Sequence, residues 1–516
     1  MKFQRHSLVV QGKITRLCES AEQATSRGDH RQSVEILERA SRLDPANPNV
    51  WLLLGSAHGR CYDYVAADDC FEKALRLTTR KTELLALAGQ RCRDFGNYEM
   101  GARWLQRAVQ QNDVPPDTLV KLAEIYERLR RLEEAIELTD RALQMDGVCV
   151  SAQLLRAKLD RRAGRLVEAE NRLRALLANS DRIIRVQGSY ELAAILDRQG
   201  RYDEAMNALL EAKALARADA PSIAARTQAA HAWAEESLNR LTTEKLQAWR
   251  DSEPALQPVR RLAVLCGHAR SGTTLLEQVL DSHPEIVSAE ETPIFLNYAH
   301  LTLARGFPEN TPLQFMLDNA QAGVLNQCRQ NYFRGVELFL GRPVADRLLI
   351  DKNPSLTRFI PLCVRVFPEL KLLVAIRDPR DVCLSCFMQP YYSIAPTSPV
   401  CLSLEQTIED YAELMGRWLK LAPLFNNSSI EVRYEDMVND LEAVARRTLD
   451  FLGLAWDPSV LKFDEHARQK VVRSPTYADV IKPVFKTAVG RWRNYQEHFE
   501  PHLKKLEPFV RRFGYE

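Results

Sequence analysis

The sequence predicts two architectures in one chain of 516 residues: an all-α repeat solenoid in the N-terminal half and an α/β domain with a central parallel sheet in the C-terminal half. Small residues recur every 34 positions in the first half. In the second half, short apolar runs alternate with helical segments. One of these runs leads through a glycine-bearing turn into a helix. A chain of this length also exceeds a single ordinary domain, so two or more hydrophobic cores are expected.

The repeat is visible in alanines that share one frame, with a spacing of 34: Ala40, Ala74, Ala108 and Ala142, and likewise Ala67, Ala135 and Ala169. Small residues at fixed positions let two antiparallel helices approach closely. The segment Trp51-x-x-Leu54-Gly55, followed by Ala67, Phe71 and Ala74, resembles the tetratricopeptide repeat. We expect about six repeats over residues 1–215. The resemblance implies a concave groove that holds a peptide or a partner protein. The alternative is an array that only caps or dimerises the second domain.

Residues 216–257 are rich in alanine and helical but leave the repeat frame. The polar stretch 251–258 contains two prolines, which break a helix. We therefore expect a helical linker at 216–257 and a second domain at 258–516.

The second domain opens with the apolar run 261–266, which lacks alternation, as in a strand buried on both faces of a parallel sheet. A turn from Gly267 to Gly272 follows, and helical spacing begins at Thr273. This order directs backbone N–H groups and the positive end of a helix to one point, where an anion can bind. A cation and hydroxyl groups lie in the same stretch: Arg270, Ser271, Thr273 and Thr274.

Gly267 and Gly272 have the spacing of the nucleoside triphosphate loop, G-x-x-x-x-G-K-[ST], but Thr273 replaces its lysine. A nucleoside triphosphate with Mg²⁺ is therefore poorly supported. The segment 269–274, Ala-Arg-Ser-Gly-Thr-Thr, resembles the P-R-S-G-T-T loop of sulfotransferases that use 3′-phosphoadenosine 5′-phosphosulfate, and departs only at the proline. The alternative is a P-loop-like strand–turn–helix with an accidental glycine pair.

Further strands are expected at 347–351, 371–376 and 430–434, with helices at 378–387, 404–421 and 441–452. Alternation of this kind indicates a parallel sheet with ligands at the carboxyl ends of its strands. Arg377 directly follows one such strand. With Ser385 it resembles the 3′-phosphate-binding segment of the same family. Alternatively, Asp378 and Asp381 hold Arg377 and Arg380 in a salt network at the start of a helix.

Other segments of this half also resemble the family. Tyr434 corresponds to a tyrosine beside the nucleotide, and Thr476 and Arg491 lie in stretches that resemble the C-terminal nucleotide lid. The closest resemblance is to tyrosylprotein sulfotransferases, whose characteristic segments reappear at 281–284 (Asp-Ser-His-Pro), 290–292 (Glu-Glu-Thr) and 481–484 (Ile-Lys-Pro-Val).

The resemblance implies transfer of a sulfuryl group to a hydroxyl acceptor by in-line displacement. It assigns Arg270 and Lys352 to the negative charge that builds on the leaving phosphate, and Glu291 to the role of general base. Adjacent side chains diverge, so Glu290 should face away from the site. His283 is the less favoured base, because Asp-Ser-His-Pro reads as a helix stop.

The acceptor is expected to be a hydroxyl of a protein, sugar or lipid. Residues 293–297 (Pro-Ile-Phe-Leu-Asn) carry no cation, which disfavours a tyrosine in an acidic peptide. The loop 389–396, rich in proline and aromatic residues, either shapes an acceptor pocket or is an ordinary surface loop. Two other functions stay open: a P-loop kinase or NTPase, and a non-catalytic repeat scaffold whose second domain binds a nucleotide.

Composition limits the partners and the cellular compartment that can be expected for the protein. The net charge of +2 disfavours a nucleic-acid binder that works through bulk electrostatics. The 11 cysteines lack metal-ligand spacing, so we expect no metal and a reducing compartment. The first residues lack the apolar core of a signal peptide, and no run is long enough to span a membrane. We therefore expect a cytoplasmic protein.

Overall fold

The computed structural model describes residues 2–178, 181–217, 237–308, 311–390, 401–470 and 486–515. The chain divides into two compact units, one of Met1–Ala178 with Glu337–Gly341 and the other of Asn179–Val336 with Arg342–Glu516. The boundaries expected from the sequence, after residues 215 and 257, stay a prediction.

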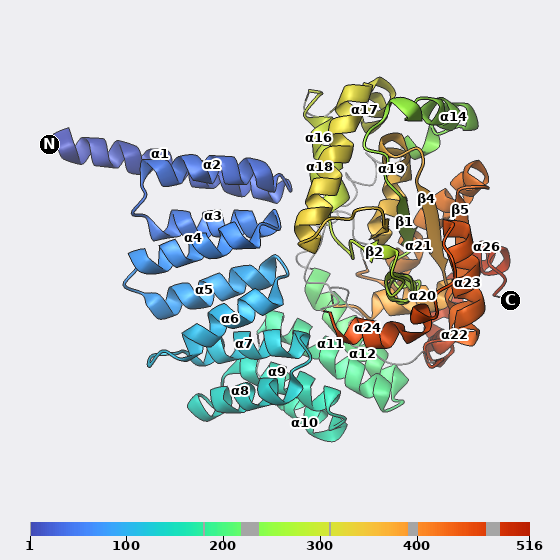
Figure 1. Cartoon of the computed structure of the whole chain (residues 1–516). Coiled ribbons are helices and arrows are strands. Elements are labelled where there is room, and N and C mark those ends of the chain that lie inside the picture. The colour runs from blue at the N-terminus through green and yellow to red at the C-terminus, as the bar shows by residue number, and fades with distance from the viewer. Residues whose placement is uncertain are drawn as a thin grey trace. The chain divides into compact units, whose positions relative to one another are not determined.

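The first unit is a stack of helices (Figure 1). Asp29, Asn47, Asp63 and Asn97 each precede a helix and accept a backbone N–H bond from its first turn, which satisfies donors that the helix leaves unpaired. The helices are α1 (Lys2–Ser26), α2 (His30–Leu43), α3 (Pro48–Arg60), α4 (Tyr64–Leu77), α5 (Lys81–Asp94), α6 (Tyr98–Val109), α7 (Pro116–Arg128), α8 (Leu132–Met145), α9 (Val150–Arg162) and α10 (Leu166–Leu177).

Small residues set the distance between these helices. The alanines of the 34-residue frame, from Ala40 to Ala169, are completely buried. A Cβ atom at Gly55 of α3 would lie 2.6 Å from Cε1 of Phe71 in α4, so a larger residue would push the pair apart. The predicted all-α repeat array is confirmed.

The second unit begins with another helix pair, α11 (Arg182–Arg198) and α12 (Tyr202–Ala216), followed by α14 (Thr243–Asp251). Its centre is a parallel sheet whose described strands lie in the order β2-β3-β1-β4-β5. The strands are β1 (Leu262–Gly267), β2 (Ile286–Ser288), β3 (Leu348–Lys352), β4 (Lys371–Ile376) and β5 (Ser429–Arg433). The central parallel sheet is confirmed; the short strand β2 has no counterpart in the sequence prediction.

Helices of several lengths surround this sheet (Figure 1). Apolar side chains of α15 and α23, such as Leu276, Leu280 and Leu449, pack with Ala263 and Leu373 of the strands in one hydrophobic core. The helices are α15 (Thr273–Asp281), α16 (Leu301–Ala304), α17 (Leu313–Asn319), α18 (Ala322–Leu340), α19 (Ile360–Val366), α20 (Pro379–Phe387), α21 (Leu404–Leu421), α22 (Tyr434–Asn439), α23 (Leu441–Leu452), α24 (Phe463–Arg468), α25 (Gln496–Phe499) and α26 (Leu503–Arg512).

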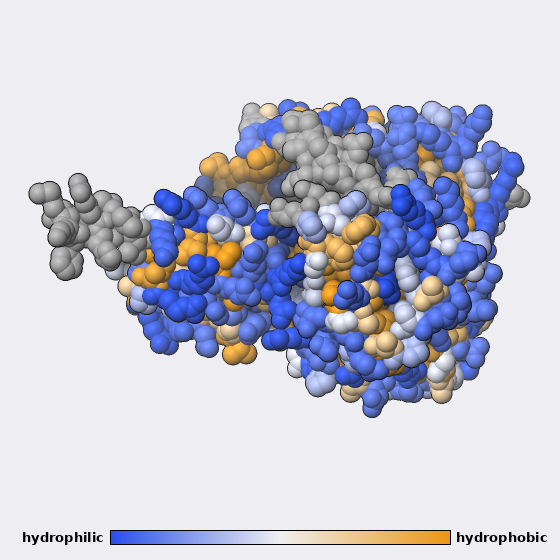
Figure 2. All heavy atoms as spheres, turned by 90° about the horizontal axis from the view of Figure 1, so that it is seen from above, coloured by the Kyte–Doolittle hydropathy of each residue, from blue (hydrophilic) through white to orange (hydrophobic). Residues whose placement is uncertain are grey.

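Hydrophilic residues cover most of the face seen in Figure 2, with small apolar areas between them. Among the described helices, none combines the length and the apolar composition that crossing a bilayer requires.

The strand order identifies where a ligand would bind. The chain leaves β1 toward β2 on one side, whereas it leaves β4 toward β5 on the other. This reversal makes the carboxyl ends of β1 and β4 a topological switch point, the usual ligand position in open α/β sheets. Gly267 ends β1 and faces Ala375 of β4.

Gly267 has no room for a side chain between β1 and β4. Its φ is +115°, and an added Cβ atom would lie 2.4 Å from the carbonyl oxygen of Ala375. The hydroxyl of Thr357 accepts a hydrogen bond from Gly267 N (2.8 Å) and donates one to Gly267 O (2.7 Å). A side chain at this position would therefore disturb the sheet and the loop that follows it.

We expect Gly267→Ala to lower the free energy of unfolding by about 2 kcal/mol or more, because it adds a strained φ and a backbone clash. Gly323 is the matched control, since it lies in α18 with nothing within 4 Å of an added Cβ atom. Gly323→Ala should change stability by less than about 1 kcal/mol. Urea unfolding of both variants tests this, and wild-type stability of Gly267→Ala would contradict it.

Candidate functional site

The loop between β1 and α15 forms the floor of the candidate site. Arg270 and Gly272 have positive φ values of 70° and 91°, which fold the loop back over the start of the helix. A Cβ atom at Gly272 would lie 2.7 Å from Cδ2 of Tyr434, the first residue of α22. The first turn of α15 contains Thr273 and Thr274, and the backbone N–H groups of a first turn have no partner within their own helix. The loop therefore has the geometry of an anion site.

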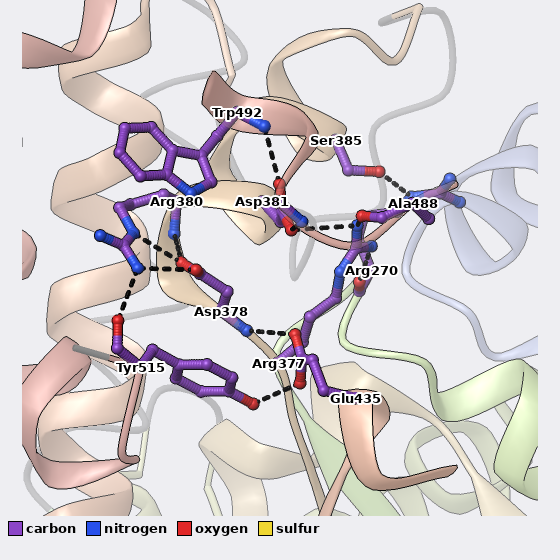
Figure 3. Close-up of polar contacts among 11 residues, drawn as sticks. Arg270, Arg377, Asp378, Arg380, Asp381, Ser385, Glu435, Ala488, Trp492 and Tyr515 are labelled. Carbon is purple, nitrogen blue, oxygen red and sulfur yellow. Dashed lines mark hydrogen bonds and ion pairs between the residues drawn. The ribbon is translucent and has the colours of Figure 1, made fainter. Parts of the chain in front are cut away.

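Arg270 connects this loop to the segment after β4 (Figure 3). Its Nε atom donates a hydrogen bond to Oγ of Ser385 in α20 at 3.0 Å. In return, Nη1 of Arg377 donates to the carbonyl oxygen of Arg270 at 3.1 Å. The structure thus brings the two segments together, although they are about a hundred residues apart in sequence.

Arg377 is buried and lies 4.9 Å from the ring centre of Tyr434. Nη2 donates to the carbonyl oxygen of Ala488 at 2.6 Å, and the carboxylate of Asp381 is 3.9 Å away. The Nε atom is buried and finds no hydrogen-bond partner among the described residues. Because a buried N–H donor without a partner costs free energy, this atom fits a site that receives an anion.

The salt network that the sequence offers as an alternative is also present, but Arg380 is its main member (Figure 3). Arg380 donates to the carboxylate of Asp378 at 2.8 and 2.9 Å and to the carbonyl oxygen of Tyr515 at 2.8 Å. Asp381 accepts backbone N–H bonds from Gly490 (2.6 Å) and Trp492 (2.8 Å). The carboxylates at the start of α20 therefore anchor the C-terminal segment, and Arg377 contacts both the network and the loop.

Lys352 is the centre of a second cluster, at the end of β3. Its side chain is completely buried, and Nζ lies 2.9 Å from Oε2 of Glu291 and 3.3 Å from Oε2 of Glu277. Burial alone would lower the pKa of Lys352, but the two carboxylates outweigh burial and raise it. The ammonium group therefore stays protonated at the bottom of the site.

The two adjacent glutamates diverge. The Glu291 side chain is 38% exposed and reaches Lys352. Glu290 has a φ of 52° and lies 4.0 Å from Nζ of Lys470, which also donates to Asp281 at 2.6 Å. Burial tends to raise the pKa of Asp281, but His466 and Lys470 lower it overall. Glu291 is thus the member of the pair that combines solvent access with contact to Lys352.

Arg491 and His283 have their printed partners outside the Lys352 cluster. Arg491 binds the carboxylate of Asp197 at 2.5 Å. Thr476, the stretch 481–484 and most of the loop 389–396 lie outside the described residues. Nε2 of His283 donates a hydrogen bond to the carbonyl oxygen of Ala455 (3.0 Å), and its Nδ1 accepts one from the backbone N–H of Glu285, so both ring nitrogens are engaged just after the end of α15.

Sequence reasoning missed three charged residues that belong to these clusters: Glu277, Lys470 and Asp197. Of the three, Glu277 could have been predicted from the sequence. It lies inside the run Leu275–Leu280, where a carboxylate on the buried side of the helix requires a buried partner. Lys470 and Asp197 could not be predicted in this way, because their partners are distant in sequence: Lys470 pairs with Asp281, and Asp197 pairs with Arg491. Within the described residues, no group of three or more His, Cys, Asp or Glu side chains is arranged to hold a metal ion.

Fold and site together define an α/β domain with a parallel sheet and a glycine-bearing loop at the switch point of that sheet. A model described as "Sulfotransferase family" matches residues 263–458, and models of the tetratricopeptide repeat match residues 87–147 and 186–219. The C-terminal part of the chain is thus a sulfotransferase-family domain, from a family of transferases that use 3′-phosphoadenosine 5′-phosphosulfate. It follows tetratricopeptide repeats and resembles tyrosylprotein sulfotransferases.

Several individual proteins are similar. Protein-tyrosine sulfotransferase 2 of Gallus gallus is 27% identical over 273 residues, which cover 49% of this chain and 69% of that protein. Protein-tyrosine sulfotransferase A of Caenorhabditis elegans is 24% identical, covering 48% and 66%. An uncharacterized protein of Aquifex aeolicus is 23% identical over 405 residues, covering 75% of this chain; the chain spans only 50% of that protein's length.

Among solved structures, the sulfotransferase domain of the Synechococcus PCC 7002 olefin synthase is 23% identical, with a TM-score of 0.34. The match covers 46% of this chain and 88% of that domain.

Asp351, next to Lys352 in β3, is a buried carboxyl group whose protonation depends on pH. It is completely buried, and the hydroxyl of Tyr332 donates to its Oδ2 atom at 2.8 Å. Burial raises the pKa of Asp351 from 3.8 to about 7, although Tyr332 and Lys352 act in the opposite direction. The folded chain therefore retains this proton over a pH range in which the unfolded chain has lost it.

A carboxyl group whose pKa is higher in the folded than in the unfolded state stabilises the fold fully below the unfolded pKa and loses that contribution as the pH rises toward the folded pKa. Between pH 4.5 and 7, the free energy of unfolding of the wild type should thus fall relative to that of Asp351→Asn by about 1.4 kcal/mol per pH unit at most. Above pH 8 the difference should level off. Urea unfolding at pH 5, 6, 7 and 8 measures it, and parallel pH profiles would contradict the assignment.

Proposed function

We propose that the chain transfers a sulfuryl group from 3′-phosphoadenosine 5′-phosphosulfate to a hydroxyl acceptor. One observation carries the proposal: Arg270, Ser385 and Arg377 are joined by hydrogen bonds, which unite two anion-binding segments at the switch point of the sheet. The donor nucleotide carries anionic groups at both its 5′ and its 3′ positions, so it needs two neighbouring anion sites.

The residues divide between the two ends of the donor. Residues 270–274 and the start of α15 hold the 5′-phosphosulfate through N–H groups, hydroxyls and one guanidinium group. Arg377 and Ser385 hold the 3′-phosphate. Tyr434 closes the space between them, because it contacts the loop at Gly272 and the guanidinium group of Arg377.

The chemistry follows from the second cluster. When the donor is bound, it supplies the sulfuryl group and a phosphate leaving group. Lys352 and Arg270 face the negative charge that grows on that phosphate as its bond to sulfur breaks. Glu291 takes the proton of the acceptor hydroxyl while the acceptor oxygen bonds to sulfur. The buried carboxylate of Glu277 holds Lys352 from the opposite side of the cluster.

The acceptor belongs to the class of hydroxyl compounds. Tyrosine is named in the similar proteins, but here Pro293 follows the Glu-Glu-Thr segment, and the next two residues, Ile294 and Phe295, are buried and apolar. They offer no cation to an acidic peptide. Protein, sugar and lipid hydroxyls are therefore the acceptors to assay.

The repeat array is proposed to dock a protein or peptide partner, the acceptor itself included. A reducing, cytoplasmic setting is part of the same proposal. It is supported by the cysteines, all 11 of which lie in the described part of the chain and are free thiols there.

Glu291→Ala should abolish transfer, by about a thousandfold or more, and leave nucleotide affinity within about threefold of the wild type, because Glu291 acts on the acceptor proton. Glu290→Ala is the matched control and should retain most of the activity. Transfer of ³⁵S-labelled sulfate to a panel of protein, sugar and lipid acceptors measures the first effect, and calorimetry the second. If Glu291→Ala still transferred sulfate, Glu291 would not be the general base.

Arg377→Ala should lower the affinity for 3′,5′-adenosine bisphosphate by about tenfold to a hundredfold, because a charge-assisted hydrogen bond to the 3′-phosphate is lost. The affinity for adenosine 5′-monophosphate, which has no 3′-phosphate, should fall by less than about threefold. Arg380→Ala serves as the control, because Arg380 is held by Asp378. It should affect the two nucleotides equally. Equal losses for both nucleotides in Arg377→Ala would favour a purely structural role in the salt network. Calorimetric titration of the wild type and both variants with each nucleotide gives the six affinities.

A further inference from the structure

Asp197 occupies an unusual place for a carboxylate. It lies in the last turn of α11, where the helix dipole disfavours a negative charge. Its side chain is only 13% exposed. A partly buried carboxylate in that position needs partners from outside its own helix.

Two residues of the C-terminal segment Arg491–Tyr495 supply those partners. Nη2 of Arg491 lies 2.5 Å from Oδ2 of Asp197, and the hydroxyl of Tyr495 donates to Oδ1 at 2.7 Å. The ring of Tyr495 also meets that of Tyr202, the first residue of α12, with centroids 5.4 Å apart. Both carboxylate oxygens are thus engaged, and the helix pair α11–α12 packs on this segment.

The backbone around Arg491 is fixed independently by the candidate donor site. Asp381 of α20 accepts the N–H groups of Gly490 and Trp492, on either side of Arg491 (Figure 3). The same carboxylate lies 3.9 Å from Arg377. Burial tends to lower the pKa of Arg491, but Asp197 and, to a smaller extent, Asp381 raise it overall. Arg491 is thereby held near Arg377, with its main chain anchored by α20 and one edge of its guanidinium group by α11.

The helix pair α11–α12 reaches α20 at a second point. Nζ of Lys213 in α12 donates to the carbonyl oxygen of Gln389 at 3.3 Å and lies 4.9 Å from the ring centre of Phe387. Phe387 is the last residue of α20, two positions after Ser385. The helix pair therefore supports both segments that flank the candidate 3′-phosphate position.

We propose that Asp197 is a positioning residue for the donor: it orients Arg491 so that the free edge of the guanidinium group meets the 3′-phosphate, and the helix pair α11–α12 thereby completes the donor site. This inference rests on the proposed function. An arginine presents five N–H donors in a rigid fork, so one edge can bind a carboxylate while another binds a phosphate. The helix pair α11–α12, which resembles a tetratricopeptide repeat, would then contribute to donor binding by the sulfotransferase-family domain.

The test is calorimetric titration of the full chain with 3′,5′-adenosine bisphosphate and with adenosine 5′-monophosphate. Asp197→Asn should lower the affinity for the bisphosphate by about tenfold and the affinity for the monophosphate by less than about twofold. Asp197→Glu should retain part of the affinity that Asp197→Asn loses. Asp203→Asn, the same change at an exposed position in α12, should leave both affinities unchanged. In an Arg491→Ala background, Asp197→Asn should have no further effect.

Equal weakening of both nucleotides by Asp197→Asn would indicate a structural role and overturn the inference. Tighter binding of the bisphosphate would overturn it as well, because Asp197 would then compete with the phosphate for Arg491. An unchanged affinity would have the same consequence. If the wild type failed to bind the bisphosphate at all, the proposed function would fall together with the inference, so the two failures are distinguishable. Thermal unfolding of each variant separates loss of binding from loss of the fold.

Discussion

The parallel pairing of β1 with β4 is the constraint on which the candidate site depends. It places Gly267 directly against Ala375, with no room for a side chain, and so brings the loop after β1 beside the segment after β4. The contacts of Arg270 with Ser385 and Arg377 follow from this proximity. A small shift of register between the two strands would separate the anion-binding segments. Backbone packing, rather than any single charged side chain, therefore determines the shape of the site.

The buried charges around Lys352 are costly, and their arrangement shows how the fold sustains them. An isolated buried ammonium group would lose several kcal/mol of hydration. Here two carboxylates face it, and Ser288 donates a 2.5 Å hydrogen bond to the inner one, Glu277. Such clusters contribute little net stability, but they fix side chains in a defined geometry. The exposed carboxylate, Glu291, is the member that solvent and an acceptor can reach.

Local patterns were enough to predict most of the fold. The apolar runs of β1, β3, β4 and β5 and the alanine frame of the repeats are signals carried by neighbouring or periodic residues. Strand β2 was missed because three residues give no pattern. For the site, the sequence supplied the residues but not their partners. The ion pairs of Lys352 with Glu277 and of Arg491 with Asp197 join residues 75 or more positions apart, so only the folded chain reveals them. The roles of Thr476 and of the segment 481–484 stay predictions.

The candidate site at the switch point is proposed to prefer an adenylate with a 3′-phosphate to a triphosphate that chelates magnesium. Calorimetric titration of the wild-type chain with 3′,5′-adenosine bisphosphate, and separately with ATP and Mg²⁺, tests it most directly. The bisphosphate should bind at least about tenfold more tightly, because Arg377 and Ser385 offer a site for its 3′-phosphate and Thr273 replaces the lysine that a triphosphate needs. Tighter binding of ATP with Mg²⁺ would contradict the account.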